Sequence, residues 1–197
     1  MSNIHNLSTP EKIVLVFLEN SEKDFTIREL SKLVGIDYKS VYFAVDSLHK
    51  IGILEKRKAG NSILCKLGKV FDHIIYKVEE YRKNELLKNN TIRVIYNEMK
   101  KVKSSFYVCL LFGSYAKGKV TKSSDIDMII VAENKESLEK ELDNIIESIP
   151  IKIHLLTFTP KEFLSNLLAG NTVVNEAVEK NIILYGIESY YRLLKYD

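Results

Sequence analysis

Residues 106–132 read FYVCLLFGSYAKGKVTKSSDIDMIIVA and decide the fold of the second half of the chain. Phe106–Phe112 is a nearly continuous apolar run, which is typical of a strand that is buried on both faces. Met128–Ala132 is a second run of this kind. Because glycine, serine and aspartate residues separate the two runs, we expect a core sheet whose connections carry the polar chemistry.

Two short motifs adjoin these predicted strands. Gly113 and Ser114 follow the first strand directly, and Asp125 and Asp127 lead into the second. Glycine lets a phosphate approach the backbone closely, a helix start offers free N–H groups, and the Ser114 hydroxyl adds a contact. Asp125 and Asp127 stand two residues apart on a strand, so their carboxylates point to the same face. Such a pair can hold Mg²⁺ against the phosphates of a nucleotide.

The spacing of the two motifs resembles a known family. Gly113-Ser114, ten residues and then Asp125-x-Asp127 resembles the signature of the polymerase-β-like nucleotidyltransferase superfamily, and more narrowly the minimal nucleotidyltransferases. The resemblance covers residues 92–190 and implies an α/β (α+β) fold with a short mixed sheet flanked by helices. It also implies Mg²⁺ on the two aspartates and a nucleoside triphosphate (NTP) on Gly113 and Ser114. The implied reaction is attack of an acceptor on the α-phosphorus, which transfers a nucleoside monophosphate and releases pyrophosphate.

Three lysines follow the glycine-serine motif, namely Lys117, Lys119 and Lys122. They could steady the triphosphate, with Lys117 as the nucleotide-binding candidate, or they could be solvated loop residues.

The chain departs from the family pattern at the next predicted strand. Catalytic members usually carry a third carboxylate there, whereas Pro150–Phe158 contains no aspartate or glutamate. Strand alternation places Lys152, His154 and Leu156 on one face and the isoleucines with Leu155 on the other. His154 is therefore the candidate for the third catalytic position. It could act as a base, or it could be a hydrogen-bonded histidine in a site that no longer turns over.

The first third of the chain predicts short helices followed by a hairpin. Thr9-Pro10 opens one helix, Thr26 caps a second that ends at Gly35, and Asp37 caps a third. Ile53–Lys58 and Ser62–Leu67 then predict two strands around the turn Ala59-Gly60-Asn61. This layout over residues 9–69 resembles the winged helix-turn-helix superfamily.

The winged-helix resemblance implies DNA as a partner. In such domains the third helix enters the major groove and the wing contacts the backbone or minor groove. The outward positions of that helix would be Tyr38, Lys39, Ser40, Tyr42 and Phe43, and the wing offers Lys56, Arg57 and Lys58 for phosphate contacts. Winged helices also serve as protein-interaction modules, and the aromatic residues fit a protein partner at least as well as base recognition.

Residues 70–104 contain no proline or glycine and predict one or two helices with apolar stripes. One stripe contains Val70, Ile74, Ile75, Val78 and Tyr81, and the other contains Ile92, Val94, Ile95 and Met99. We interpret this segment as a linker, a homodimer interface or both, between a DNA-binding domain at 1–69 and a nucleotidyltransferase-like domain at 105–197. Lysine and arginine exceed acidic residues by 11 to 8 in residues 1–69, whereas acidic residues exceed them by 13 to 10 in residues 106–197.

Composition excludes several classes of protein. The chain is 197 residues long, 46% hydrophobic and 28% charged, with 8 glycines and 3 prolines, which excludes collagen-like and low-complexity chains. No apolar run approaches the roughly 20 residues of a membrane span, and the first residues show no secretory signal. Cys65 and Cys109 form neither a disulfide framework nor metal-ligand spacing. We expect a cytoplasmic protein with no membrane partner.

Three functional interpretations remain open at the level of sequence. The first is an active enzyme, and the minimal-nucleotidyltransferase resemblance implies an antitoxin that attaches AMP to a tyrosine of a HEPN-type toxin ribonuclease. The second is a DNA-binding regulator whose transferase-like half serves as a nucleotide sensor or dimeriser. The third is an adaptor that uses both modules to bind protein.

Overall fold

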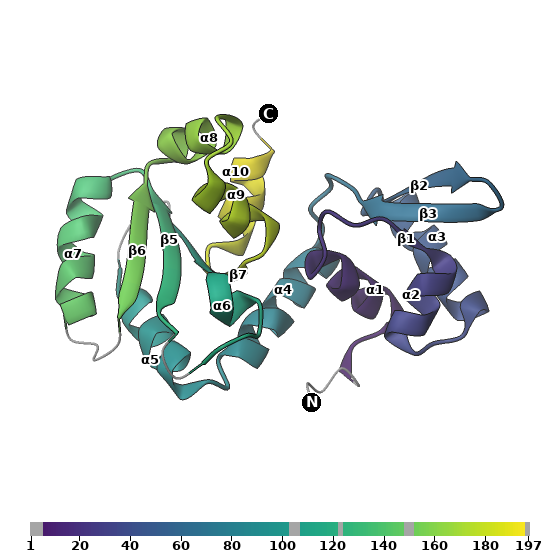
Figure 1. Cartoon of the computed structure of the whole chain (residues 1–197), viewed down its shortest axis with the longest axis horizontal. Coiled ribbons are helices and arrows are strands. Elements are labelled where there is room, and N and C mark those ends of the chain that lie inside the picture. The colour runs from purple at the N-terminus through teal and green to yellow at the C-terminus, as the bar shows by residue number, and fades with distance from the viewer. Residues whose placement is uncertain (1–5, 103–106, 122–123, 148–151, 196–197) are drawn as a thin grey trace. The chain divides into compact units, whose positions relative to one another are not determined.

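The computed structural model describes residues 6–102, 107–121, 124–147 and 152–195. The chain divides into two compact units, Met1–Glu80 and Tyr81–Asp197. The division falls within helix α4 (His73–Leu86), inside the segment that the sequence predicts as a linker. Figure 1 shows the elements of each unit. Phe106, Lys122, Pro150 and Ile151, which the sequence analysis names, lie outside the described residues.

The first unit is a winged helix-turn-helix domain, as predicted. Three helices, α1 (Thr9–Leu18), α2 (Ile27–Val34) and α3 (Tyr38–Lys50), precede a hairpin of β2 (Leu54–Ala59) and β3 (Ser62–Leu67). A two-residue strand, β1 (Phe25–Thr26), pairs with β3, so the antiparallel sheet has the order β1-β3-β2. The hairpin is the wing.

Local sequence signals account for the helix boundaries of this unit. The Thr26 side chain accepts a hydrogen bond from the Glu29 backbone N–H and begins α2, and Asp37 accepts one from the Ser40 N–H and begins α3. Gly35 ends α2 in the left-handed conformation with φ +68°. The predicted hairpin turn is one residue too long, because Ala59 pairs with Ser62 and leaves only two residues in the turn.

The apolar faces of α1, α2 and α3 form the core of the first unit. Ile13, Val14, Phe17, Leu30 and Val45 are fully buried there. Glu11 is also buried, and it accepts hydrogen bonds from the Ser8 backbone at 2.8 Å and from Lys77 of α4 at 2.6 Å. These contacts keep the buried carboxylate hydrogen-bonded, as a buried charge requires.

The second unit has the predicted mixed sheet. β4 (Tyr107–Phe112) lies between β5 (Ile126–Ala132) and β7 (Ile182–Tyr185), and β6 (Ile153–Phe158) pairs with β5, which gives the order β6-β5-β4-β7. The β5–β6 pair is parallel and the other two pairs are antiparallel. Every residue of β4 is buried, as its apolar run predicts.

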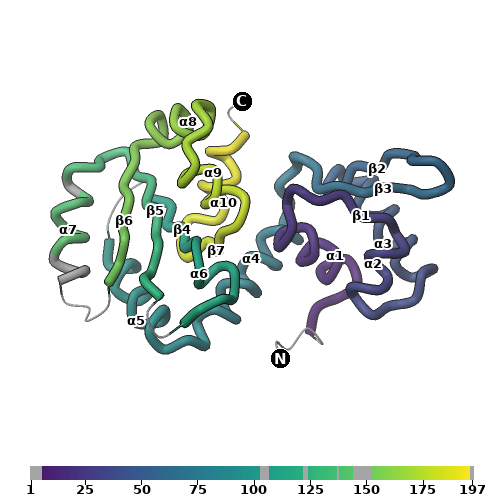
Figure 2. Tube along the Cα trace, in the orientation of Figure 1, coloured from purple at the N-terminus to yellow at the C-terminus, as the bar shows by residue number. Residues whose placement is uncertain are grey.

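Helices cover both faces of this sheet. Residues of α5 (Asn90–Met99) and α7 (Lys135–Glu147) share one hydrophobic cluster with alternate residues of β4 and β5. The other helices, α8 (Pro160–Leu168), α9 (Thr172–Glu179) and α10 (Ile187–Leu194), contact β4, β5, β6 and one another. In Figure 2, α7 lies beside β6, whereas α8, α9 and α10 form a separate group. The short helix α6 (Gly113–Ala116) follows β4 directly.

The predicted linker, residues 70–104, contains two helices rather than one. α4 ends at Leu86, and Asn89 caps α5 by accepting hydrogen bonds from two backbone N–H groups. Ile92, Ile95 and Met99 pack into the core of the second unit, whereas Val94, which the sequence analysis places on the same stripe, is exposed and was assigned wrongly. Among the described residues, no helix is both long and apolar enough to cross a bilayer.

Candidate functional site

His154 lies between the two aspartates of the second motif. Asp127 of β5 and His154 of β6 are neighbours in the parallel ladder, and the His154 Nδ1 atom is 3.3 Å from Asp127 Oδ1. The other ring nitrogen, Nε2, is 3.6 Å from Asp125 Oδ2. The register of β5 and β6 therefore brings together the three side chains that the sequence singles out as catalytic candidates.

Gly113 contacts the same cluster from the other neighbouring strand. Phe112, the last residue of β4, pairs with Asp127, so the residue that follows it comes against the Asp127 carboxylate. Gly113 has φ +65°, and a Cβ at this position would lie 2.2 Å from Asp127 Oδ2. Glycine suits this turn, because a side chain here would be strained by the backbone conformation and would force the Asp127 carboxylate to move. Ser114 is the next residue and is half-buried.

Lys152 is a member of the cluster that the sequence analysis did not assign to the site. Its ammonium group lies 3.0 Å from Asp125 Oδ2 and is exposed. The strand alternation that selected His154 also places Lys152 on this face, but the partner of the lysine follows only from the β5–β6 register. Lys152 and His154 thus place two basic groups against the two carboxylates.

The predicted nucleotide-binding lysine has a partner within the second unit. Lys117, just after α6, forms a 2.6 Å ion pair with Glu176 of α9. This pair ties the turn that follows Gly113 and Ser114 to α9. Lys119 is exposed.

The described part of β6 carries no carboxylate, in agreement with its sequence. Ile153 and Leu155 pack against the hydrophobic cluster, while His154 and Leu156 are exposed on the opposite face. On the cluster side of β6, Glu139 of α7 accepts a hydrogen bond from Thr157. Thr157 and His154 lie on opposite faces of β6. Glu139 therefore does not replace the missing carboxylate beside His154.

Asp125 and Asp127 fit a magnesium ion that is held jointly with a nucleotide. Mg²⁺ prefers oxygen ligands and is commonly bound by one or two carboxylates together with substrate phosphates and water. Both carboxylates contact the one imidazole ring of His154, and Asp127 also lies against Gly113, where a phosphate can approach the backbone. Within the described ranges, no group of three histidine, cysteine or acidic side chains has the geometry of a complete metal site. Phosphate oxygens would therefore have to complete the coordination.

The predicted DNA-contacting residues of α3 are all exposed. Tyr38, Tyr42 and Phe43 have exposed fractions of 51%, 39% and 58%, and Lys39 and Ser40 are exposed beside them. The ring centroids of Tyr38 and Tyr42 lie 6.4 Å apart, and those of Tyr42 and Phe43 lie 5.9 Å apart. The start of α3 therefore presents a continuous row of three aromatic rings.

The wing cations differ in their surroundings. Lys56 forms a 2.8 Å ion pair with Asp46 of α3, and its side chain is only 20% exposed. This hydrogen bond from Lys56, together with one from Lys50, lowers the pKa of Asp46 to about 2. Arg57 forms an ion pair of 2.8 Å with Asp24 and is exposed. Lys58 is exposed near the tip of the wing.

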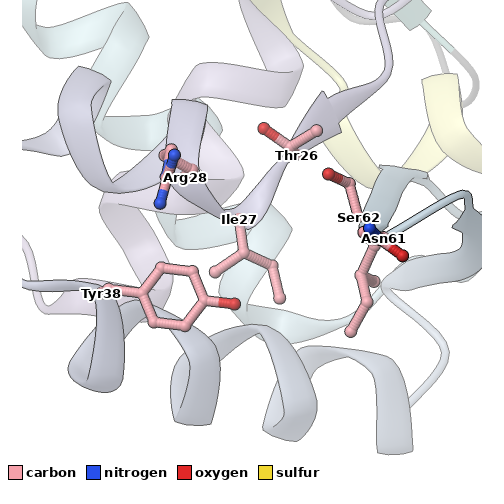
Figure 3. Close-up of a pocket in the computed structure, with 7 residues that line it drawn as sticks. Thr26, Ile27, Arg28, Tyr38, Asn61 and Ser62 are labelled. Atoms are coloured by element: carbon pink, nitrogen blue, oxygen red, sulfur yellow. The ribbon is translucent and has the colours of Figure 1, made fainter.

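A hollow lies between the tip of the wing and the first residues of α2 and α3 (Figure 3). Its volume is about 520 Å³, and it is lined by Thr26, Ile27, Arg28, Tyr38, Asn61, Ser62 and Ile63. Periodicity and spacing gave no sign of it, because its lining residues come from three separate segments, two of which the β1–β3 pairing brings together.

The glycine-serine turn lies against Asp127 of β5, with Asp125 just before the strand, on a mixed sheet with helices on both faces, and this arrangement is that of a nucleotidyltransferase-type domain. Residues 89–186 match the family model described as polymerase beta, nucleotidyltransferase. This segment is therefore a nucleotidyltransferase domain of the polymerase β type, and it adjoins a winged helix in the same chain. No curated protein matches the chain.

Three solved structures show a weak likeness to the chain. They are the adhesin competence repressor AdcR from Streptococcus pyogenes (20% identity, 50% of this chain and 70% of that chain, TM-score 0.32), RV1404 from Mycobacterium tuberculosis (18%, 51% and 78%, 0.33) and ZitR from Lactococcus lactis (16%, 73% and 83%, 0.29). The winged-helix assignment rests on the strand order and helix caps of this chain, since these scores are too low to support it.

Proposed function

We propose that the second unit binds Mg²⁺ with an NTP at the turn after β4 and transfers a nucleoside monophosphate to a protein or other acceptor. The observation that supports this most is the contact between Gly113 and Asp127. It places the turn suited to phosphate beside the carboxylate suited to the metal. Asp125 lies on the other side of His154 and completes the carboxylate pair.

Each residue of the cluster has a role in the proposed reaction. Gly113 and Ser114 bind the phosphates of the NTP, with Lys117 close by. Asp125 and Asp127 hold Mg²⁺, which when bound neutralises the charge on the phosphate oxygens. An acceptor hydroxyl oxygen bonds to the α-phosphorus, the bond from that phosphorus to the α–β bridging oxygen breaks, and pyrophosphate leaves with the electron pair. His154 takes the proton of the acceptor hydroxyl.

A second candidate function is a regulator that binds nucleotide without turnover. The specific observation in its favour is the replacement of a third carboxylate by basic groups, since Lys152 and His154 both contact the aspartates. In this case the second unit senses a nucleotide or forms a homodimer, and the winged helix regulates by binding DNA.

For the first unit we propose DNA binding through α3 and the wing. The exposed Lys39 and Ser40 on α3 and the exposed Lys58 on the wing support this proposal. Lys56 and Arg57 also form ion pairs inside the unit, so we assign them a share in holding the wing as well as in contacting phosphate. Under the enzymatic proposal, a HEPN-type toxin is the protein acceptor that the family resemblance implies.

Label transfer from α-labelled ATP, GTP, CTP and UTP with Mg²⁺, in an extract of the native host, tests the enzymatic proposal. The control is the double variant Asp125→Asn/Asp127→Asn. Label that reaches a protein or RNA only with the intact aspartates supports an enzyme and identifies its acceptor class. Mg²⁺-dependent nucleotide binding without transfer supports the sensor, and the absence of both contradicts the two functions.

DNA binding is tested separately by a gel shift on the promoter of the protein's own gene. The double variant Lys39→Ala/Lys58→Ala should weaken binding and reduce the dependence of log K on log salt by about one for each phosphate contact that is lost. Lys66→Ala is a matched control, because Lys66 is exposed on β3 and pairs with Glu55. If Lys66→Ala weakens binding as much as Lys39→Ala/Lys58→Ala does, the assignment of α3 and the wing as the DNA-binding face is contradicted.

A further inference from the structure

The aromatic row of the first unit, defined as Tyr38, Tyr42 and Phe43, is unusual for a helix that reads paired bases. In a duplex, the bases present their edges to the major groove, and edges are read by hydrogen-bonding side chains. The rings of the row instead offer apolar faces, and each ring contacts the next. Aromatic faces are the surfaces on which unpaired bases stack.

The hollow beside Tyr38 has the size and lining for one nucleotide. Its volume of about 520 Å³ lies in the range of sites that hold small organic ligands. Ile27 and Ile63 give it an apolar lining, while Asn61 and Ser62 supply amide and hydroxyl groups that can hydrogen-bond to the edge of a base. Figure 3 shows the Tyr38 ring extending below Ile27, with Asn61 and Ser62 on the opposite side.

Charge complementarity favours a nucleic acid over an apolar protein partner at this place. Arg28 lines the hollow, and Lys39 follows Tyr38 on α3. Residues 1–69 carry 11 lysines and arginines against 8 acidic residues. A ring for the base and a guanidinium for the phosphate therefore lie at one site, which is the combination that single-strand binding proteins use.

We propose that the first unit binds nucleic acid with one unpaired base in the hollow, stacked on Tyr38, and with further unpaired bases on Tyr42 and Phe43. The inference rests on the proposed nucleic-acid binding of the winged helix and adds that the preferred target is an unpaired or bulged strand rather than an intact duplex.

The test uses the full chain and three probes of the same sequence. They are a paired DNA duplex, the same duplex with one bulged 2-aminopurine, and the single strand with 2-aminopurine at that position. Fluorescence anisotropy gives the affinity at fixed salt, and 2-aminopurine emission reports stacking. We expect the bulged and single-stranded probes to bind at least about tenfold more tightly than the duplex, with quenched emission.

Variants of the row assign the preference to Tyr38. Tyr38→Ala should remove most of the tenfold preference and the quenching, whereas Tyr38→Phe should keep both, because the ring is retained. Ile51→Ala is the matched control, since Ile51 lies at the other end of α3 and is 52% exposed. Thermal unfolding verifies that each variant is folded.

The outcomes distinguish the inferred preference for unpaired bases from the underlying proposal that the first unit binds nucleic acid. Salt-sensitive binding of the duplex with no preference for unpaired bases overturns the inference and leaves the proposed DNA binding in place. Binding of none of the probes overturns both. Self-association of the chain that Tyr38→Ala and Phe43→Ala abolish would show a second copy on the row, and this also overturns the inference.

Discussion

Replacing Gly113 by alanine should separate the effect of backbone conformation from the effect of the Asp127 contact. Gly113 and Gly118 both have φ +65°. An added Cβ would lie 2.2 Å from Asp127 Oδ2 at Gly113, but it would meet nothing within 4 Å at Gly118. Gly118→Ala is therefore a control with the same backbone strain and no clash.

The expected magnitudes follow from this difference. A left-handed alanine costs about 1 kcal/mol of folding free energy, which should be the whole effect of Gly118→Ala. Gly113→Ala adds an overpacking term of about 1–3 kcal/mol, unless the Asp127 carboxylate moves away. Movement of the carboxylate would relieve the clash but displace the proposed metal ligand. Gly113→Ala should therefore lose stability, Mg²⁺-dependent NTP binding or both, beyond the loss in the control.

A double-mutant cycle supplies the assay. The free energy of unfolding by urea and the binding of a fluorescent ATP analogue with Mg²⁺ are measured for Gly113→Ala, for Asp127→Ala and for the double variant. Asp127→Ala removes the atom that is 2.2 Å from the new Cβ, so the additional cost of Gly113→Ala should largely vanish in that background. The reasoning is refuted if Gly113→Ala costs no more than Gly118→Ala, both with Asp127 in place and in the Asp127→Ala background.

Three further perturbations have expected outcomes. Burial raises the pKa of Glu11, but hydrogen bonds from Lys77 and from the N-cap serine outweigh it and lower the pKa below its usual value of 4.5. The carboxylate therefore stabilises the first unit above the unfolded pKa and loses this effect as the pH falls through the folded value. Glu11→Gln should flatten the loss of thermal stability that acid causes below the usual pKa. Lys152→Met removes an exposed cation from Asp125, so the affinity for Mg²⁺, measured by titration, should rise by up to about fivefold. Arg82 is buried and donates to a backbone carbonyl, so Arg82→Met should reduce the free energy of unfolding of the second unit by about 1–3 kcal/mol in urea titrations.

The features that the sequence predicted correctly are those that a few neighbouring residues determine. Thr26, Gly35 and Asp37 bound their helices through contacts within a few positions, and the structure places the caps where the residue types predict them. The apolar run of β4 is equally local, since it needs only burial on both faces to be recognised. Together with the two family resemblances, these signals predicted a winged helix followed by a mixed sheet.

The features that the sequence did not predict depend on contacts between distant residues. β1 is two residues long and exists because Phe25 pairs with Cys65, which no local pattern reveals. The contact of Lys152 with Asp125 depends on the parallel register of β5 and β6. Val94 was assigned wrongly because it stands two residues after Ile92, and on a helix this spacing turns it away from the side that Ile92, Ile95 and Met99 share.

The replacement of a third carboxylate by His154 leads to a last prediction, which distinguishes the two proposed functions. His154 pairs in register with Asp127 on the adjacent strand, so an aspartate at this position would bring a third carboxylate to the same face. In His154→Asp, removal of the imidazole and addition of an anion should both favour a divalent cation. A tenfold gain in affinity corresponds to about 1.4 kcal/mol of extra stabilisation at saturating Mg²⁺.

Thermal unfolding with and without Mg²⁺ measures this gain, and His154→Ala is the control that removes the ring without adding charge. A shift of roughly 3–6 °C per kcal/mol is expected for a unit of this size, so His154→Asp should gain several degrees over the control. If His154 is the proton acceptor, label transfer should be lost in His154→Ala and retained in part in His154→Asp, because a carboxylate can also accept a proton. If the site is a sensor, both variants should stay without transfer while Mg²⁺ binding still improves in His154→Asp. An Mg²⁺ shift that is equal in the two variants would contradict the convergence of these side chains on one metal site.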